Sequence, residues 1–341
     1  MLVFTDEWKQ QIIDRYKHLK DHNKPDLYFV AVSEQNEQLR LEIEESVAVL
    51  PRSVQKGVVT RLRSPSNFTH TYHELVVGRL LRQLGYAVEY EVNVGGRTPD
   101  WYVNAKGEIS AFVLEVFTAN VSDKRAAEIR AVKTLWGWLR EIPITGVVVY
   151  VETTEDEITC DDKRGKRIAR AVRQWLENTP PVGSRLTFEE FAFDVVYYNP
   201  SYTSLQIAGP AAAFMVNKEP VRINFREKIR KYRRILAEKN LPLVVGVVAD
   251  FMTGVKFDSF LEVMYGSEAV NYAYNEATGE VRGARLARMN DGLFHREPSL
   301  SAAVWVERDV SGGWQMRAIH NQQAAHPLPV NTFSIEGAEG A

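Results

Sequence analysis

Three carboxylates between residues 66 and 120 have the types and the spacing of a divalent metal site. Glu74 stands in a segment with helical periodicity, Asp100 begins a short β-type run, and Glu115 lies inside the next one. Carboxylate oxygens are the hard ligands that Mg²⁺ and Mn²⁺ take in proteins, with water or phosphate oxygens in the remaining positions. The pattern therefore predicts a site for one of these ions.

Glu115 is the most informative of the three because of its surroundings. Residues 110–118 (SAFVLEVFT) are apolar on both alternating faces, as expected of a central strand that is covered on both sides. A carboxylate there costs several kcal/mol unless it is paired, protonated or bound to a metal. The alternative to a ligand is a structural glutamate satisfied by an arginine or a backbone N–H.

Asp100 is expected to meet Glu115 through a hairpin. The sequence Asn-Ala-Lys-Gly at residues 104–107 is a natural turn between two β-type runs, so residues 98–118 are predicted to form that hairpin. Asp100 begins its first strand and Glu115 stands near the end of its second. The two carboxylates should therefore lie side by side.

The chain resembles the PD-(D/E)XK nuclease superfamily over residues 66–152. The matching residues are Pro99-Asp100, Glu115-Val116-Phe117 and Glu74 on the preceding helix. The resemblance implies an α-β-β-β-α-β core and metal-dependent hydrolysis of phosphodiesters, usually in DNA. It implies that Asp100 and Glu115 are ligands of Mg²⁺ or Mn²⁺, and that Glu74 is an accessory catalytic carboxylate.

Phe117 departs from the family pattern, because it stands where the family has its catalytic lysine. The resemblance allows a lysine from a neighbouring helix, and the candidates are Lys124 and Lys133 on the following helix and Lys228 further on. Two hypotheses follow, an active endonuclease or a catalytically inactive nuclease fold that binds nucleic acid or a partner protein. A third is an unrelated α/β protein in which Glu115 is ion-paired and lies far from Asp100.

The predicted fold class is mixed α/β, with a restriction-endonuclease-like core, a central mixed sheet flanked by helices, and additions at both ends. Residues 1–63 are expected to form a helix, a strand pair (27–32 and 39–50) and a basic linker that contains Arg61. The core spans residues 64–250, with a helix at 123–140 and a strand at 146–152. If the helix at 222–240 and the strand at 242–250 rejoin the sheet, residues 153–220 are an insertion and Lys228 and Lys231 come near the site. Residues 251–333 form an α/β extension that includes a polar, turn-rich part at 271–288, and residues 334–341 a disordered tail.

Two basic helices are candidate surfaces for a nucleic-acid backbone. The helix at 163–177 presents Lys166, Arg167 and Arg170, and the helix at 222–240 presents Arg226 and Arg230. The alternative for both is a solvated helix face, with the first neutralised by the acidic segment before it.

Composition sets broad limits on the class of protein. Hydrophobic residues make up 45% of the 341, charged residues 25%, and the net charge is −2, which argues against a coat protein for nucleic acid. The single cysteine, Cys160, excludes an internal disulfide framework and a multi-cysteine zinc site. No apolar run approaches the length of a membrane span and the N-terminus lacks a signal-peptide pattern, so a cytoplasmic protein without membrane contact is expected. A homodimer is compatible with the sequence, and analogy with the family suggests a role in bacterial restriction, repair or defence.

Overall fold

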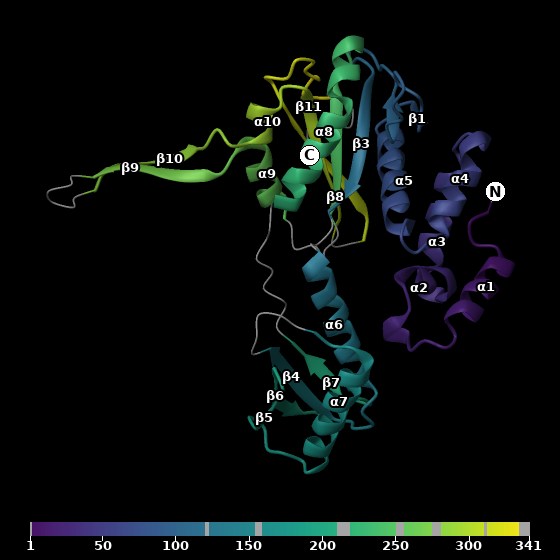
Figure 1. Ribbon diagram of the computed structural model, residues 1–341, viewed down its shortest axis with the longest axis vertical. Coiled ribbons are helices and arrows are strands. Elements are labelled where there is room, and N and C mark those ends of the chain that lie inside the picture. The colour runs from purple at the N-terminus through teal and green to yellow at the C-terminus, as the bar shows by residue number, and fades with distance from the viewer. Residues whose placement is uncertain are drawn as a thin grey trace. The chain divides into compact units, whose positions relative to one another are not determined.

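The computed structural model describes residues 2–119, 123–153, 159–209, 219–249, 256–274, 281–309 and 312–333, without the side chains of 22, 123–126, 129, 271–274 and 281–286. The chain forms two compact units (Figure 1). Unit 1 comprises Met1–Ile12, Asp26–Asn120 and Val216–Ala341, and unit 2 comprises Ile13–Pro25 and Val121–Met215. None of the helices in the described ranges is both long enough and apolar enough to cross a membrane.

A central mixed sheet organises unit 1, which confirms the mixed α/β class. Its strand order is β1-β2-β3-β8-β11-β12, with β3, β8 and β11 parallel and the outer pairs antiparallel. The strands are β1 (Val88–Tyr90), β2 (Trp101–Val103), β3 (Phe112–Thr118), β8 (Leu243–Ala249), β11 (Leu300–Arg308) and β12 (Trp314–His320).

Helices cover both faces of this sheet, as the apolar pattern of residues 110–118 predicts. Helix α5 (Phe68–Gln83) packs on one face of β3, and α8 (Glu219–Lys239) and α9 (Phe257–Tyr265) lie on the other (Figure 1). Every residue of β3 and β8 is buried. A polar side chain in the middle of β3 is therefore enclosed by protein on both sides.

The C-terminal region joins the central sheet, so the prediction of a separate extension at 251–333 was wrong. Strand β11 pairs with β8 through a long parallel register, because its apolar residues face helices on both sides. The turn-rich segment expected at 271–288 is instead a two-stranded sheet of β9 (Glu268–Tyr274) and β10 (Val281–Arg288), and α10 (Leu293–Arg296) follows. Its apolar residues recur at alternate positions (Val270, Tyr272, Tyr274), which is a strand pattern. The tail at 334–341 lies outside the described residues.

The N-terminal region is helical, so the strand pair at 27–32 and 39–50 was a wrong prediction. Buried Ile43, Val47 and Leu50 recur at helical spacing, whereas Leu41, which suggested a strand alternation, is exposed. The linker with Arg61 is a helix as well, because Val58, Val59 and Leu62 share one buried stripe. The helices are α1 (Asp6–Tyr16), α2 (Asp26–Val32), α3 (Glu37–Ala48) and α4 (Arg52–Leu62), with 3₁₀ turns at Asp21–Asn23 and Glu34–Asn36.

Unit 2 is a four-stranded sheet with two helices and a core of its own. Its strand order is β5-β6-β4-β7, with only the β4–β7 pair parallel. The elements are α6 (Asp123–Arg140), β4 (Val147–Thr153), α7 (Asp162–Glu177), β5 (Arg185–Phe188), β6 (Phe191–Tyr198) and β7 (Gln206–Ala208). The helix and strand expected at 123–152 in the nuclease-like core thus belong to unit 2, and the insertion begins at residue 121 and not at 153. The pair α8–β8 takes the place beside β3, because the run Leu243–Ala249 is apolar on both faces.

Candidate functional site

The predicted hairpin brings Asp100 and Glu115 together. Strand β2 pairs with β3 so that Trp101 stands opposite Leu114, which places Asp100 at the level of Glu115. The Val116 N–H donates a hydrogen bond of 2.6 Å to Oδ2 of Asp100. The backbone of β3 thus holds one carboxylate beside the other, and the hypothesis that the two lie too far apart to share a cation is wrong.

Helix α8 supplies a cation to both carboxylates. Lys228 Nζ lies 2.6 Å from Oε2 of Glu115 and 3.7 Å from Oδ2 of Asp100. The Lys228 side chain is 22% exposed and that of Glu115 is 0% exposed, so the pair is largely shielded from water. Lys231, one turn further along α8, places its Nζ 3.5 Å from Oε1 of Glu115.

Burial and the nearby charge of Glu115 dominate the electrostatics of Asp100. Burial, together with the charge of Glu115, raises the pKa of Asp100 to about 7, and the Lys228 charge opposes this only in part. Burial lowers the pKa of Lys228, but the charges of Asp100 and Glu115 outweigh it, and the net shift is upward. Two carboxylates crowded in this way favour any additional cation.

The donor set fits a divalent ion of the Mg²⁺ type. Oε1 of Glu115 is buried and makes no hydrogen bond to any residue that the structure describes. It is ion-paired with Lys231 Nζ at 3.5 Å, a contact that a bound metal ion would replace. The described residues include no group of three or more His, Cys, Asp or Glu side chains that could hold a metal. Mg²⁺ is often held by only one or two carboxylates, with water and substrate phosphates around it. Asp100 and Glu115 are sufficient by that criterion.

The two aromatic residues closest to the motif pack into the protein. Phe117 lies against Phe225 of α8, with ring centroids 5.1 Å apart, so no lysine could replace it without burying its charge. Trp101 is buried on the opposite face of the sheet, against Gly78 of α5. Its Nε1 donates a hydrogen bond of 2.9 Å to the Glu74 carbonyl, which ties α5 to the hairpin.

Glu74 is engaged through both of its oxygens. His70 Nε2 lies 3.0 Å from Oε1, and the Tyr90 hydroxyl donates a hydrogen bond to Oε2. Burial raises the pKa of Glu74, but the hydrogen bonds from His70 and Tyr90 lower it by more than burial raises it, so the net shift is downward. Glu74 is thus a buried, ionised carboxylate that holds two neighbouring side chains.

The other predicted residues of the site do not join Asp100 and Glu115 in the described structure. Lys124 belongs to α6 of unit 2, and its side chain lies outside the described residues. Arg226 and Arg230 stand two positions before and after Lys228, and a helix turns such neighbours to its opposite side. They are candidate phosphate contacts only on a surface that faces away from the carboxylates.

The three predicted contacts on α7 have different surroundings. Lys166 lies over the Trp138 ring, with its Nζ 4.8 Å from the centroid, and Arg167 Nε donates a hydrogen bond of 2.7 Å to Glu189. Arg170 is exposed and makes no ion pair with another described residue. The partner of Arg167 comes from the β5–β6 turn.

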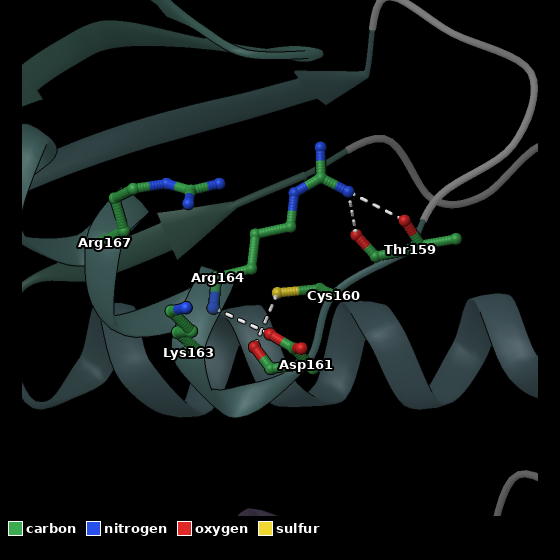
Figure 2. Close-up of a pocket in the computed structure, with 6 residues that line it drawn as sticks. All are labelled: Thr159, Cys160, Asp161, Lys163, Arg164 and Arg167. Carbon is green, nitrogen blue, oxygen red and sulfur yellow. Dashed lines mark hydrogen bonds between the residues drawn. The ribbon is translucent and has the colours of Figure 1, made fainter.

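A pocket of about 300 Å³ lies at the start of α7, lined by residues 159–161, 163, 164 and 167 (Figure 2). Arg164 reaches back past Cys160 to Thr159 in this view, and also pairs with Glu189 and Glu190. Burial raises the pKa of the Cys160 thiol to about 11. The pocket therefore has neither a reactive thiolate nor an unneutralised guanidinium cluster.

The sequence reasoning did not assign a role to Arg61 or Tyr90. Arg61 of α4 donates a hydrogen bond of 2.8 Å to the Tyr90 hydroxyl, which in turn holds Glu74. Both partners come from segments far apart in the sequence, so no local spacing marked them. His70 was visible, since it stands four residues before Glu74 on the same helix face.

Comparisons with protein-family models, curated proteins and solved structures found no match to this chain. Any conclusion on function therefore depends on the residues and their geometry.

Proposed function

We propose that this protein is a metal-dependent nuclease of the PD-(D/E)XK type that hydrolyses DNA. The observation that carries the proposal is the convergence of Lys228 on Asp100 and Glu115. A lysine amine beside the two carboxylates is the third member of the family motif, and here a helix supplies it in place of Phe117.

The order of elements in unit 1 supports the same proposal. Helix α5, strands β1 to β3, helix α8 and strand β8 follow one another in the α-β-β-β-α-β order of that family, with unit 2 inserted between β3 and α8. The carboxyl ends of the parallel strands β3, β8 and β11 meet at one edge of the sheet. Glu115 is the fourth of the seven residues of β3, so the pair lies three residues short of that edge, where α/β proteins generally bind their ligands.

The residues have distinct roles in the proposed reaction. Asp100 and Glu115 would hold Mg²⁺ or Mn²⁺, which when bound supplies positive charge to a phosphate and acidifies a water. Lys228 would donate a hydrogen bond to a phosphate oxygen and stabilise the charge that develops on it. Phe117 and Phe225 exclude water from the inner side of the site.

Nicking of supercoiled plasmid in the presence of Mg²⁺ or Mn²⁺ tests the proposal. We expect the wild-type protein to nick, and Asp100→Ala, Glu115→Ala and Lys228→Ala to reduce nicking to background. Glu238→Gln is the matched control, because Glu238 is an exposed carboxylate on α8 that pairs only with Arg234 among the described residues. Its nicking rate should equal that of the wild type.

Calorimetric titration with the same ions separates the alternatives. Metal binding that Asp100→Ala and Glu115→Ala abolish, together with nicking, establishes the site. The absence of both nicking and metal binding would contradict the proposal, and the protein would then be a module that binds nucleic acid or a protein. Retained nicking in both carboxylate variants would place the chemistry elsewhere in the chain.

A further inference from the structure

His70 is a half-exposed histidine whose ring is held by a buried carboxylate. Its Nε2 lies 3.0 Å from Oε1 of Glu74; its side chain is 46% exposed and that of Glu74 is 7% exposed. Its other nitrogen, Nδ1, makes no hydrogen bond within the described part of the chain. The ring thus has one fixed nitrogen and one nitrogen open to a ligand or to water.

Glu74 is in turn fixed by residues from two other elements. The Tyr90 hydroxyl, at the end of β1, donates to its Oε2, and Arg61 of α4 donates to that hydroxyl over 2.8 Å. Arg61 also pairs with Glu91, its Nη2 being 3.0 Å from Oε1. A carboxylate held this rigidly selects the tautomer with the proton on Nε2 and keeps the Nδ1 lone pair free.

The charge that acts most strongly on His70 is that of Glu74, and Asp100 and Lys228 act on it from the proposed metal site. The hydrogen bond that His70 donates to Glu74 raises the pKa of His70, burial lowers it, and the charges of Glu74 and Asp100 raise it while that of Lys228 lowers it. The net shift is upward from the ordinary value, so the surroundings of the ring favour the imidazolium that a general base forms. The three groups come from α5, the start of β2 and α8.

His73, three residues further along α5, provides the internal contrast. Burial lowers its pKa to about 3, and its Nδ1 lies 2.8 Å from the Thr118 hydroxyl. His73 is thus a neutral packing residue. The pKa values of the two histidines shift in opposite directions, because His70 has a carboxylate partner and His73 does not.

We propose that His70 is the general base of this site and that Glu74 is the residue that positions it. The proposal rests on the proposed nuclease function and adds a proton acceptor to it. It also gives Glu74 a positioning role, whereas the resemblance implied an accessory catalytic carboxylate.

In the proposed step, His70 accepts a proton from the attacking water. A water oxygen forms a bond to phosphorus while the bond between phosphorus and the leaving sugar oxygen breaks. The water proton passes to Nδ1 of His70, and the resulting imidazolium is stabilised by Glu74. The leaving oxygen takes a proton from solvent, and the imidazolium returns one to solvent.

A histidine titration by NMR tests the dyad without activity. In the metal-free wild-type protein, His70 should titrate above the ordinary histidine value and carry its neutral-state proton on Nε2. Glu74→Gln should lower the pKa of His70, whereas exposed His295 on α10 should titrate identically in both proteins. An unchanged His70 titration in Glu74→Gln would overturn the dyad.

Plasmid nicking then tests the role of the dyad. His70→Ala should lower the rate by about 10² to 10⁴ with metal binding retained, and added imidazole should restore part of it. Glu74→Gln should move the acid limb of the pH profile to lower pH, because a base of lower pKa remains unprotonated there. His295→Gln is the control and should change neither quantity.

The outcomes separate this inference from the proposed function. If the wild type nicks and His70→Ala nicks equally well, His70 is not the base and the nuclease proposal stands. Loss of metal binding in His70→Ala would make His70 a ligand and would also overturn the inference. A wild type that does not nick any nucleic acid with either ion contradicts both proposals.

Discussion

Each unit contains ion pairs between basic side chains and carboxylates, but the Arg167 pair on α7 of unit 2 is exposed to solvent, whereas the Lys228 pair at the candidate site of unit 1 is largely buried. In unit 2, Arg167 and Glu189 pair at the surface, and Arg164 reaches the same glutamate. In unit 1, Lys228 pairs with Glu115, which no solvent reaches. Exposed pairs are worth little because water serves each charge almost as well, whereas a buried carboxylate depends on its partner.

The comparison shows that two basic helices of similar composition have different surroundings, and why only one of them contributes to the candidate site. Both basic helices, at 163–177 and at 222–240, suggested phosphate contacts from their sequence. Around α7 the described structure pairs cation with anion and leaves the pKa of Glu189 lowered, since the hydrogen bonds from Arg164 and Arg167 outweigh burial. Around Lys228 two carboxylates compete for the same space, and the pKa of Asp100 is raised to about 7. A buried carboxylate with a raised pKa distinguishes the candidate site.

The largest expected effect is on folding stability when Lys228 is removed. Lys228→Met should lower the free energy of unfolding by about 3 to 5 kcal/mol, because Glu115 and Asp100 remain buried without their nearest cation. Lys231 compensates little, since its Nζ lies 3.5 Å away. Arg167→Met, the counterpart in unit 2, should cost less than about 1 kcal/mol. Urea denaturation measures both.

A double variant sharpens this comparison. Glu115→Gln combined with Lys228→Met should cost less than the sum of the two single variants, because each alone strands a charge. Equal costs for Lys228→Met and Arg167→Met would mean that solvent screens the pair in unit 1 as well.

The second effect is a dependence of stability on pH that comes from Asp100. Its folded pKa of about 7 is above its ordinary value of 3.8, so the folded state binds the proton more tightly than the unfolded state. Stability from this group is full below about pH 4 and is lost as pH rises to about 7, by roughly 2 to 4 kcal/mol. Asp100→Asn should not show this loss.

The measurement is urea denaturation of wild type and Asp100→Asn from about pH 4 to about pH 8 in EDTA. Repeating it with Mg²⁺ should restore stability to the wild type at the higher pH, since a bound ion offsets the crowded charge. Parallel pH curves for the two proteins would show that Asp100 ionises normally.

The sequence predicted contacts between residues that are close along the chain, and it did not predict contacts between residues that are far apart along the chain. The hairpin at 98–118 is local, so the turn residues and the alternation were enough to place Asp100 beside Glu115. Lys228 was one of three lysine candidates, because its place depended on whether β8 or β4 joined the sheet beside β3. The two strands have the same length and differ mainly in the polar end of β4, at Glu152 and Thr153, which was too weak a signal to decide between them.

The errors have the same physical origin. Residues 27–32 and 39–50 were assigned as strands because short apolar runs fit either periodicity, and only the packing of α2 on α3, and of α3 on α4 and α5, shows which face is inside. Strands β11 and β12 were recognised as strands, but their sheet was not, because strand pairing is a long-range property. Arg61 was taken for a linker residue for the same reason.

The smallest effect concerns a glycine that lies against a tryptophan in each unit. A Cβ on Gly78 would lie 2.0 Å from the Trp101 ring, and a Cβ on Gly165 would lie 2.5 Å from the Trp138 ring. Trp101 is fully buried and cannot withdraw, whereas Trp138 is partly exposed. Gly78→Ala should therefore cost about 1 to 3 kcal/mol by overpacking, and Gly165→Ala clearly less.

The same pair separates packing from function. Trp101 follows Asp100 directly and donates its N–H to the Glu74 carbonyl, so moving the ring should displace Asp100 and Glu74. Gly78→Ala should reduce metal binding and nicking under conditions in which the protein is still folded, and Gly165→Ala should not. Gly57→Ala is the control for helix propensity, because Gly57 lies in α4 with open space around it and should gain up to about 1 kcal/mol. If Gly78→Ala loses stability while its metal affinity is unchanged, the contact between α5 and the hairpin supports the fold without setting the geometry of the site.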